Sequence, residues 1–196
     1  MTFIETVPEA KATGAVAEMY DADRETLGDL PNFTKAFSLR PDVYTAWRHL
    51  NGAIKANMDL RQYELATVAA ARRLGSSYCT LAHGSVLMNK FLEPQAVRAL
   101  VEDFRMADLE PAELALMELA DKVAHDATSV TRADVDRLRT LGLTDGEIFD
   151  VVLAAAARCF FSKTLDALGV EPDAKYSELE PELREALTVG RPIAHH

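Results

Sequence analysis

Apolar positions along the chain recur with the spacing of amphipathic helices, and no run alternates between apolar and polar residues as a half-buried strand does. The window 60–74 shows the pattern clearly, because leucine, valine and alanine fill most of its positions. Asp59 suits the N-cap of this helix, and Gly75 suits the left-handed position after its last turn. A further helix is predicted to follow the N-cap residue Ser76 and to run to about Lys90.

The remaining sequence carries the same kind of helix signals. Acidic residues followed by proline, or threonine followed by acidic residues, open most segments, and glycine closes several of them. Further helices are predicted over residues 14–27, 32–40, 40–56, 93–104, 110–126, 131–142 and 144–169, with one amphipathic helix in the tail 170–187. These signals predict an all-α, multihelical bundle that forms one domain over residues 1–196, with its core at about 14–172.

A weak internal sequence similarity, called the echo below, accompanies the helix pattern. Glu64 lies twelve residues before Ser76, and Glu147 lies twelve residues before Cys159. Both segments carry an alanine-arginine stretch and finish near a glycine. A duplicated helical hairpin would produce this echo, and so would an alanine-rich composition, and both explanations stay open at this point.

Composition and charge narrow the classes of partner. The 196 residues include 31 acidic and 21 basic side chains, for a net charge of −10, so we expect neither nucleic acid nor an anionic membrane as a partner. The longest apolar run, residues 151–157, is far too short to span a bilayer. The first residues carry no basic stretch followed by an apolar one, and Cys79 and Cys159 are the only cysteines. We therefore expect a cytoplasmic protein with reduced thiols.

The segment "SSYCTLAHGS", residues 76–85, carries the candidate chemistry. If Ser76 is the N-cap, Cys79 is the third helical residue, where free backbone N–H groups and the helix dipole stabilise a thiolate. His83 follows one turn later on the same face, and Glu64 on the preceding helix is the available carboxylate. Because Glu64 stands among apolar residues, we expect burial to raise its pKa and suit it to proton transfer. The alternative is that Cys79 is a small buried hydrophobe.

This pattern resembles the AhpD-like, or carboxymuconolactone decarboxylase, family. The redox members of that family carry a glutamate, then eleven residues, then C-x-x-C-x3-H, which Glu64 and residues 76–83 match in spacing. The segments 30–47, 130–152 and 165–172 also resemble the longer, peroxidase-related members. The likeness covers roughly residues 14–172 and implies the fold of that family, built as a helical bundle.

The resemblance assigns roles to the matching residues. Glu64 matches the glutamate of the motif, Cys79 the second cysteine and His83 the histidine, whereas Ser76 stands where redox members have the first cysteine. Since serine forms no disulfide, the resemblance implies a one-cysteine peroxidase, in which Cys79 attacks the peroxide and becomes a sulfenic acid. An external thiol, or Cys159 if it lies near, would then reduce it. Ser76 either caps its helix or donates to the thiolate or the peroxide.

Three further side chains are candidates for the substrate pocket, namely Tyr78, His49 and Trp47. We read the segment 154–161 around Cys159 as a buried packing helix.

The leading interpretation is a thiol-dependent hydroperoxide reductase, with a small hydroperoxide and an external thiol reductant as its partners. The alternatives are a carboxymuconolactone decarboxylase-like enzyme that uses His83 and Glu64 without thiol chemistry, and a helical ligand-binding oligomer without turnover. We expect no cofactor and no metal, and the resemblance implies a homo-oligomer, either a dimer or a trimer-based hexamer.

Overall fold

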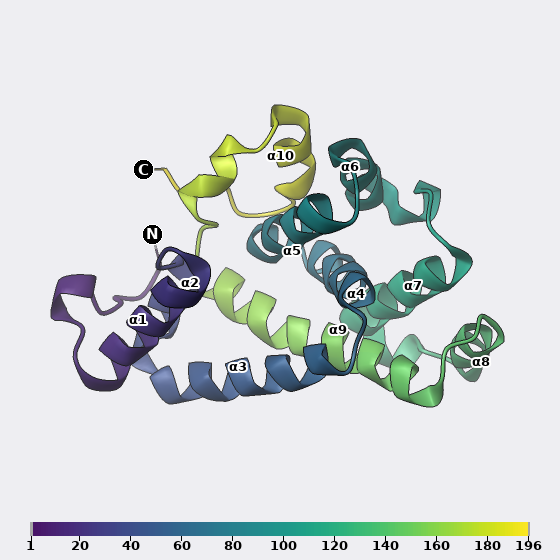
Figure 1. Ribbon diagram of the computed structural model, residues 1–196, viewed down its shortest axis with the longest axis horizontal. Helices are drawn as coiled ribbons and strands as arrows, with labels where there is room; N and C mark the ends of the chain where they lie inside the picture. The colour runs from purple at the N-terminus through teal and green to yellow at the C-terminus, as the bar shows by residue number, and fades with distance from the viewer. Residues whose placement is uncertain (1, 196) are drawn as a thin grey trace.

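The computed structural model describes residues 2–195, so Met1 and His196 at the ends of the predicted domain lie outside it. Within this range the regular structure is entirely helical (Figure 1). The α-helices are α1 (Gly14–Leu27), α2 (Asn32–Ala36), α3 (Pro41–Ala56), α4 (Leu60–Arg73), α5 (Ser77–Lys90), α6 (Pro94–Asp103), α7 (Pro111–Asp126), α8 (Arg132–Thr140), α9 (Asp145–Ala167) and α10 (Pro181–Leu187). Short 3-10 helices lie at η1 (Glu9–Lys11), η2 (Phe37–Leu39), η3 (Phe104–Met106), η4 (Ala127–Ser129) and η5 (Ala174–Glu178). The predicted all-α fold is confirmed.

The end signals in the sequence correspond to the observed helix ends. Asp59 caps α4 by accepting a hydrogen bond from the backbone N–H of Gln62, and Gly75 after the helix has a φ of 68°. The predicted helix 32–40 differs, because it divides into α2 and η2. Its last residue, Arg40, precedes a proline, which disfavours the helical region for Arg40, and its φ and ψ are −146° and 67°.

The two echoing segments have different structures. Glu64 lies within α4 and Ser76 precedes α5, so twelve residues there span a turn between two helices. Glu147 and Cys159 both lie within the single helix α9. Glu147 accepts a hydrogen bond from the Thr144 backbone N–H at 2.8 Å and completes a capping box. The echo therefore does not mark equivalent helical hairpins.

Helix α4 is the centre of the core. All residues from Tyr63 to Ala71 are buried, and the helix packs against α5, α7 and α9, as its place in Figure 1 shows. Its alanines let the neighbouring helices approach closely, which brings α4, α5 and α9 together around one point. Across the described residues, each helix is too short or too polar to cross a lipid bilayer.

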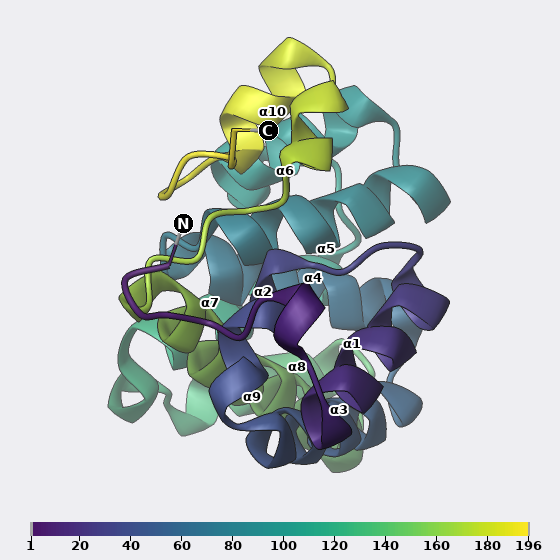
Figure 2. The same ribbon diagram turned by 90° about the vertical axis from the view of Figure 1, so that its left-hand side faces the viewer.

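The C-terminal segment returns across the start of α5 (Figure 2). The backbone N–H of Gly190 donates to the Ser77 hydroxyl at 2.7 Å, and the side chain of Arg191 donates to the carbonyl of Asp166. A Cβ on Gly190 would lie 2.0 Å from the carbonyl oxygen of Gly75. The C-terminal segment is therefore in close contact with the turn that leads into the helix of Cys79.

We expect Gly190→Ala to destabilise the fold because its methyl group would push the segment off a backbone oxygen that cannot rotate away. Overpacking of this kind costs about 1–3 kcal/mol, which lowers the melting temperature by several degrees in a chain of this size. Gly146→Ala is the matched control, since its Cβ would meet only the Thr144 hydroxyl, at 3.8 Å. Equal melting temperatures for Gly190→Ala and the wild type would show that the contact contributes nothing.

Candidate active site

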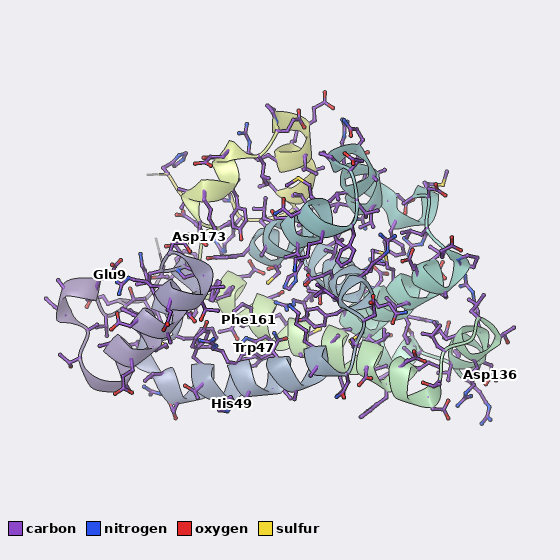
Figure 3. All side chains as sticks on the ribbon, viewed as in Figure 1. Glu9, Trp47, His49, Asp136, Phe161 and Asp173 are labelled. Carbon is purple, nitrogen blue, oxygen red and sulfur yellow. The ribbon has the colours of Figure 1, made fainter. Side chains whose placement is uncertain are left out.

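A cavity of about 340 Å³ lies between α1, α2, α3, α5 and α9. Its wall is largely aromatic, formed by Phe33, Tyr44, Trp47, Tyr78 and Phe161. The rings of Trp47 and Phe161 stack with their centroids 4.9 Å apart, and Figure 3 shows both side chains in the space between α3 and α9. The site thus offers a small, flat, apolar surface to a ligand.

Cys79 lines this cavity at the third position of α5. Its side chain is 2% exposed, and its sulfur accepts a hydrogen bond from Nη1 of Arg158 at 3.5 Å. The backbone N–H groups of the first turn of a helix have no partner within that helix and favour a negative charge near them. The sulfur therefore lies next to two sources of positive potential, the start of α5 and the guanidinium group of Arg158.

Arg158 enters the site from α9 and is 3% exposed. Its Nη2 donates to the hydroxyl of Tyr63 at 3.4 Å, and that hydroxyl donates to Asn51 Oδ1 at 2.8 Å. Burial acts to lower the pKa of Arg158, but the interactions with Cys79 and Tyr63 outweigh it and raise the pKa. The guanidinium is therefore cationic beside the sulfur.

His83, one turn after Cys79 on α5, pairs with the buried carboxylate of Glu64 on α4. Nδ1 of His83 lies 2.5 Å from Oε2 of Glu64, and Nζ of Lys55 lies 3.7 Å from Oε1. We expected burial to raise the pKa of Glu64, and this was wrong. Burial does act in that direction, but His83, Lys55 and Arg158 together lower the pKa.

The ionised Glu64 determines the protonation of its partner. A carboxylate only accepts hydrogen bonds, so Nδ1–H of His83 is the donor and Nε2 is the basic nitrogen. Burial and the positive charge of Arg158 lower the pKa of His83, against the opposing effect of Glu64. His83, which also lines the cavity, is therefore a neutral base near neutral pH.

We expect His83 to titrate below its ordinary pKa of 6.5 when its ring protons are followed by NMR. In Arg158→Met the pKa should rise, because the positive charge that disfavours imidazolium is gone. Substitution of the exposed Arg132, which lies on α8, is the control and should leave the titration unchanged. A His83 pKa at or above the ordinary value in the wild type would contradict the arrangement described here.

Of the other residues singled out from the sequence, two line the cavity and three do not. Tyr78 and Trp47 line the cavity, whereas His49 is exposed on α3 and lines a separate surface groove (Figure 3). Ser76 holds the N-cap position of α5, but its hydroxyl makes no capping hydrogen bond, and the residue is fully buried away from the cavity wall. Cys159 is half-buried next to Arg158 in the chain, and it does not line the cavity. Burial raises the pKa of its thiol.

Sequence reasoning missed Arg158, Tyr63, Asn51 and Lys55. Four residues of the segment 154–161 are buried beside Arg158, as expected of a packing helix, namely Ala154, Ala155, Ala157 and Phe161. The signal that was available was the charge itself, since an arginine in an alanine and phenylalanine run needs a partner inside the core. Within residues 2–195, no group of three or more His, Cys, Asp or Glu side chains is placed to hold a metal ion.

Comparisons with known proteins identify the fold and the family that the central segment matches. The model of the carboxymuconolactone decarboxylase family matches residues 41–122, which include Glu64, Cys79 and His83. No curated protein matches the sequence. A structure described as an alkylhydroperoxidase AhpD core, from a peroxidase-related protein of Ralstonia eutropha JMP134, is 21% identical with a TM-score of 0.80, and the match covers 97% of this chain and 98% of that one.

Two more solved structures share the architecture. A peroxidase-related protein from Silicibacter sp. TM1040 is 21% identical with a TM-score of 0.75, covering 89% of this chain and 91% of its own. The C82A variant of the debrominase Bmp8, in complex with 2,3,4-tribromopyrrole, is 17% identical with a TM-score of 0.73. The match covers 95% of this chain and 96% of that one. At these identities the likeness shows the fold. Residues 41–122 thus match the carboxymuconolactone decarboxylase family, and the chain has the AhpD-like fold seen in peroxidase-related proteins.

Proposed function

We propose that this protein is a thiol-dependent hydroperoxide reductase that uses Cys79 as its single reacting cysteine. The observation that carries the proposal is the contact of 3.5 Å between the Cys79 sulfur and the buried guanidinium of Arg158, in a cavity that His83 also lines. A cation and a base next to a thiol are the groups that activate a sulfur nucleophile. The AhpD-like fold and the peroxidase-related names of its structural neighbours support the same reaction class.

The reaction follows from these groups. Nε2 of His83 takes the thiol proton, and the Cys79 thiolate attacks the terminal peroxide oxygen as the O–O bond breaks. The alkoxide that leaves receives the proton from His83, so that thiol and hydroperoxide become sulfenic acid and alcohol. An external thiol then forms a mixed disulfide with Cys79 and releases water, and a second external thiol restores the free Cys79 and leaves as a disulfide. Ser76 takes no part in this reduction because a hydroxyl forms no disulfide.

The direct test is consumption of cumene hydroperoxide by the full chain in the presence of dithiothreitol. We expect turnover, with the loss of hydroperoxide and the oxidation of dithiol in equal amounts. Absence of turnover with cumene hydroperoxide and with hydrogen peroxide would reject the proposed function.

A second reaction of the same thiol is reductive dehalogenation. The specific observation is the stacked aromatic wall of Trp47 and Phe161 beside Cys79, in a fold shared with a debrominase that binds tribromopyrrole. Here the thiolate takes the halogen from a ring carbon, the carbon takes a proton, and two external thiols release halide from the sulfur as they become a disulfide. Release of bromide from a brominated pyrrole, faster than consumption of hydroperoxide, would favour this reaction over the first.

The external thiol, the homo-oligomer and the cytoplasmic location are parts of the same proposal. Large apolar side chains are exposed on two of the helices that border the cavity, with Leu50 on α3 and Phe149 and Phe160 on α9. We expect a second copy of the chain to cover this surface, because apolar area on neighbouring helices is stabilised when it leaves water. Reduced Cys79 requires a compartment that keeps thiols free.

A further inference from the structure

Arg158 is a buried cation without an acidic partner. Its two hydrogen bonds go to a sulfur and a phenol, and its Nε–H has no partner among residues 2–195. No carboxylate within the part of the chain that the structure describes forms an ion pair with it. Since a buried guanidinium is stable only when its charge is balanced, the site lacks one negative group.

The carboxylates nearby are already engaged. Asp23 lines the cavity, but its carboxylate accepts hydrogen bonds from Thr34 at 2.5 Å, Tyr44 at 2.6 Å and Arg48 at 2.7 Å. The carboxylate of Glu64 faces His83 and Lys55. Glu64 interacts with Arg158 only at a distance, through its charge, and neither carboxylate accepts a hydrogen bond from the guanidinium, so an anion bonded directly to Arg158 has to come from elsewhere.

A thiolate at Cys79 supplies only part of what the guanidinium needs. It contacts one nitrogen, Nη1, while Nε–H is buried without an acceptor and Nη2 donates to the neutral hydroxyl of Tyr63. Arg158 also lines the cavity, and a guanidinium group binds carboxylates through charge-assisted hydrogen bonds. The rings of Trp47 and Phe161 lie 5.8 Å and 5.6 Å from the guanidinium carbon, so aromatic surface borders this cation.

We propose that the cavity binds small aromatic carboxylates, with the acid group on Arg158 and the ring against Trp47, Phe33 and Phe161. A cavity of about 340 Å³ fits a ligand with one ring and small substituents. The identification of this ligand as the substrate rests on the proposed function, under which the substrate is an aromatic hydroperoxide that also bears a carboxylate. Binding itself requires Arg158 and does not require the thiol.

The test uses benzoate and its neutral isostere benzamide, titrated calorimetrically into the full chain and into Cys79→Ala. We expect benzoate to bind at least about tenfold more tightly than benzamide in both proteins, because only the carboxylate pairs with the guanidinium. Arg158→Met should abolish this preference, and Arg132→Met, which removes an exposed arginine from α8, should keep it. If Arg158→Met fails to fold, Arg158→Lys takes its place. This variant keeps the charge but not the planar fork, so we expect its preference for benzoate over benzamide to be smaller than that of the wild type.

The outcomes separate the two proposals. Equal binding of benzoate and benzamide, or an undiminished preference in Arg158→Met, would overturn the assignment of the anion site, whatever the activity towards cumene hydroperoxide. Preferential binding of benzoate that depends on Arg158, in a protein that reduces no hydroperoxide, would uphold the anion site and reject the proposed function.

Discussion

Replacing Cys79 by serine is expected to lower kcat/KM for hydroperoxide reduction by more than about 10³-fold, as the loss of a nucleophile does in other enzymes. Serine keeps the size and the helix position, but its hydroxyl is not ionised near neutral pH and forms no sulfenic acid. The fold should persist, because a serine at a position one turn into α5 disturbs little packing. Steady-state kinetics with cumene hydroperoxide and dithiothreitol measures the effect.

The matched control is Cys159→Ser, which removes the only other thiol. Cys159 does not line the cavity, and burial raises the pKa of its thiol, so we expect turnover within about twofold of the wild type. A loss of activity in Cys159→Ser would indicate that this residue resolves the sulfenic acid. The decarboxylase-like alternative without thiol chemistry predicts a different result. Cys79→Ala would then decarboxylate a lactone substrate as fast as the wild type, whereas His83→Ala and Glu64→Gln would lose this activity.

Arg158→Met is expected to lower the rate of Cys79 oxidation by about 10- to 100-fold. A hydrogen bond from a charged donor contributes about 1.5–3 kcal/mol, and each 1.4 kcal/mol corresponds to a factor of ten in rate. Methionine fills a similar volume without a charge, and such replacements of buried ions are often neutral or stabilising. We therefore expect the melting temperature to stay the same or rise while the activity falls.

Opposite changes in activity and stability identify Arg158 as part of the chemistry and not of the scaffold. The rate of Cys79 oxidation in Arg158→Lys should lie between the rates in the wild type and in Arg158→Met, since a lysine carries the charge but not the planar fork. Unchanged oxidation of Cys79 in Arg158→Met would contradict the role of the guanidinium, and a large drop in melting temperature would show that the arginine is structural.

The helices were predictable because their end signals are local. Asp59 and Gly75 bound α4 through contacts within a few residues, so no knowledge of the tertiary fold was needed. The same holds for the position of Cys79 in α5, which follows from the N-cap at Ser76. The pairing of His83 with Glu64 was expected from the resemblance and from helix spacing, and the structure brings the two side chains into contact.

The environment of the sulfur was not predictable in the same way. Arg158 lies 79 residues from Cys79 in the chain, and only the packing of both α5 and α9 against α4 brings the guanidinium to the thiol. The pKa of Glu64 was misjudged for the same reason, since Lys55 and Arg158 come from other helices and outweigh the effect of burial. Ser76 was given a role in the reaction because it occupies the position of the first cysteine in the family motif, but its side chain does not line the cavity.

The most direct measurement is the state of Cys79 after a single turnover. The reduced full chain is mixed with one equivalent of cumene hydroperoxide, trapped with a sulfenic acid reagent, and analysed by peptide mass spectrometry. One oxygen equivalent on Cys79, trapped as sulfenic acid, with Cys159 still a free thiol and one cumyl alcohol formed, is the result that we predict. An unmodified Cys79 in a folded protein, with the hydroperoxide intact, would contradict the account.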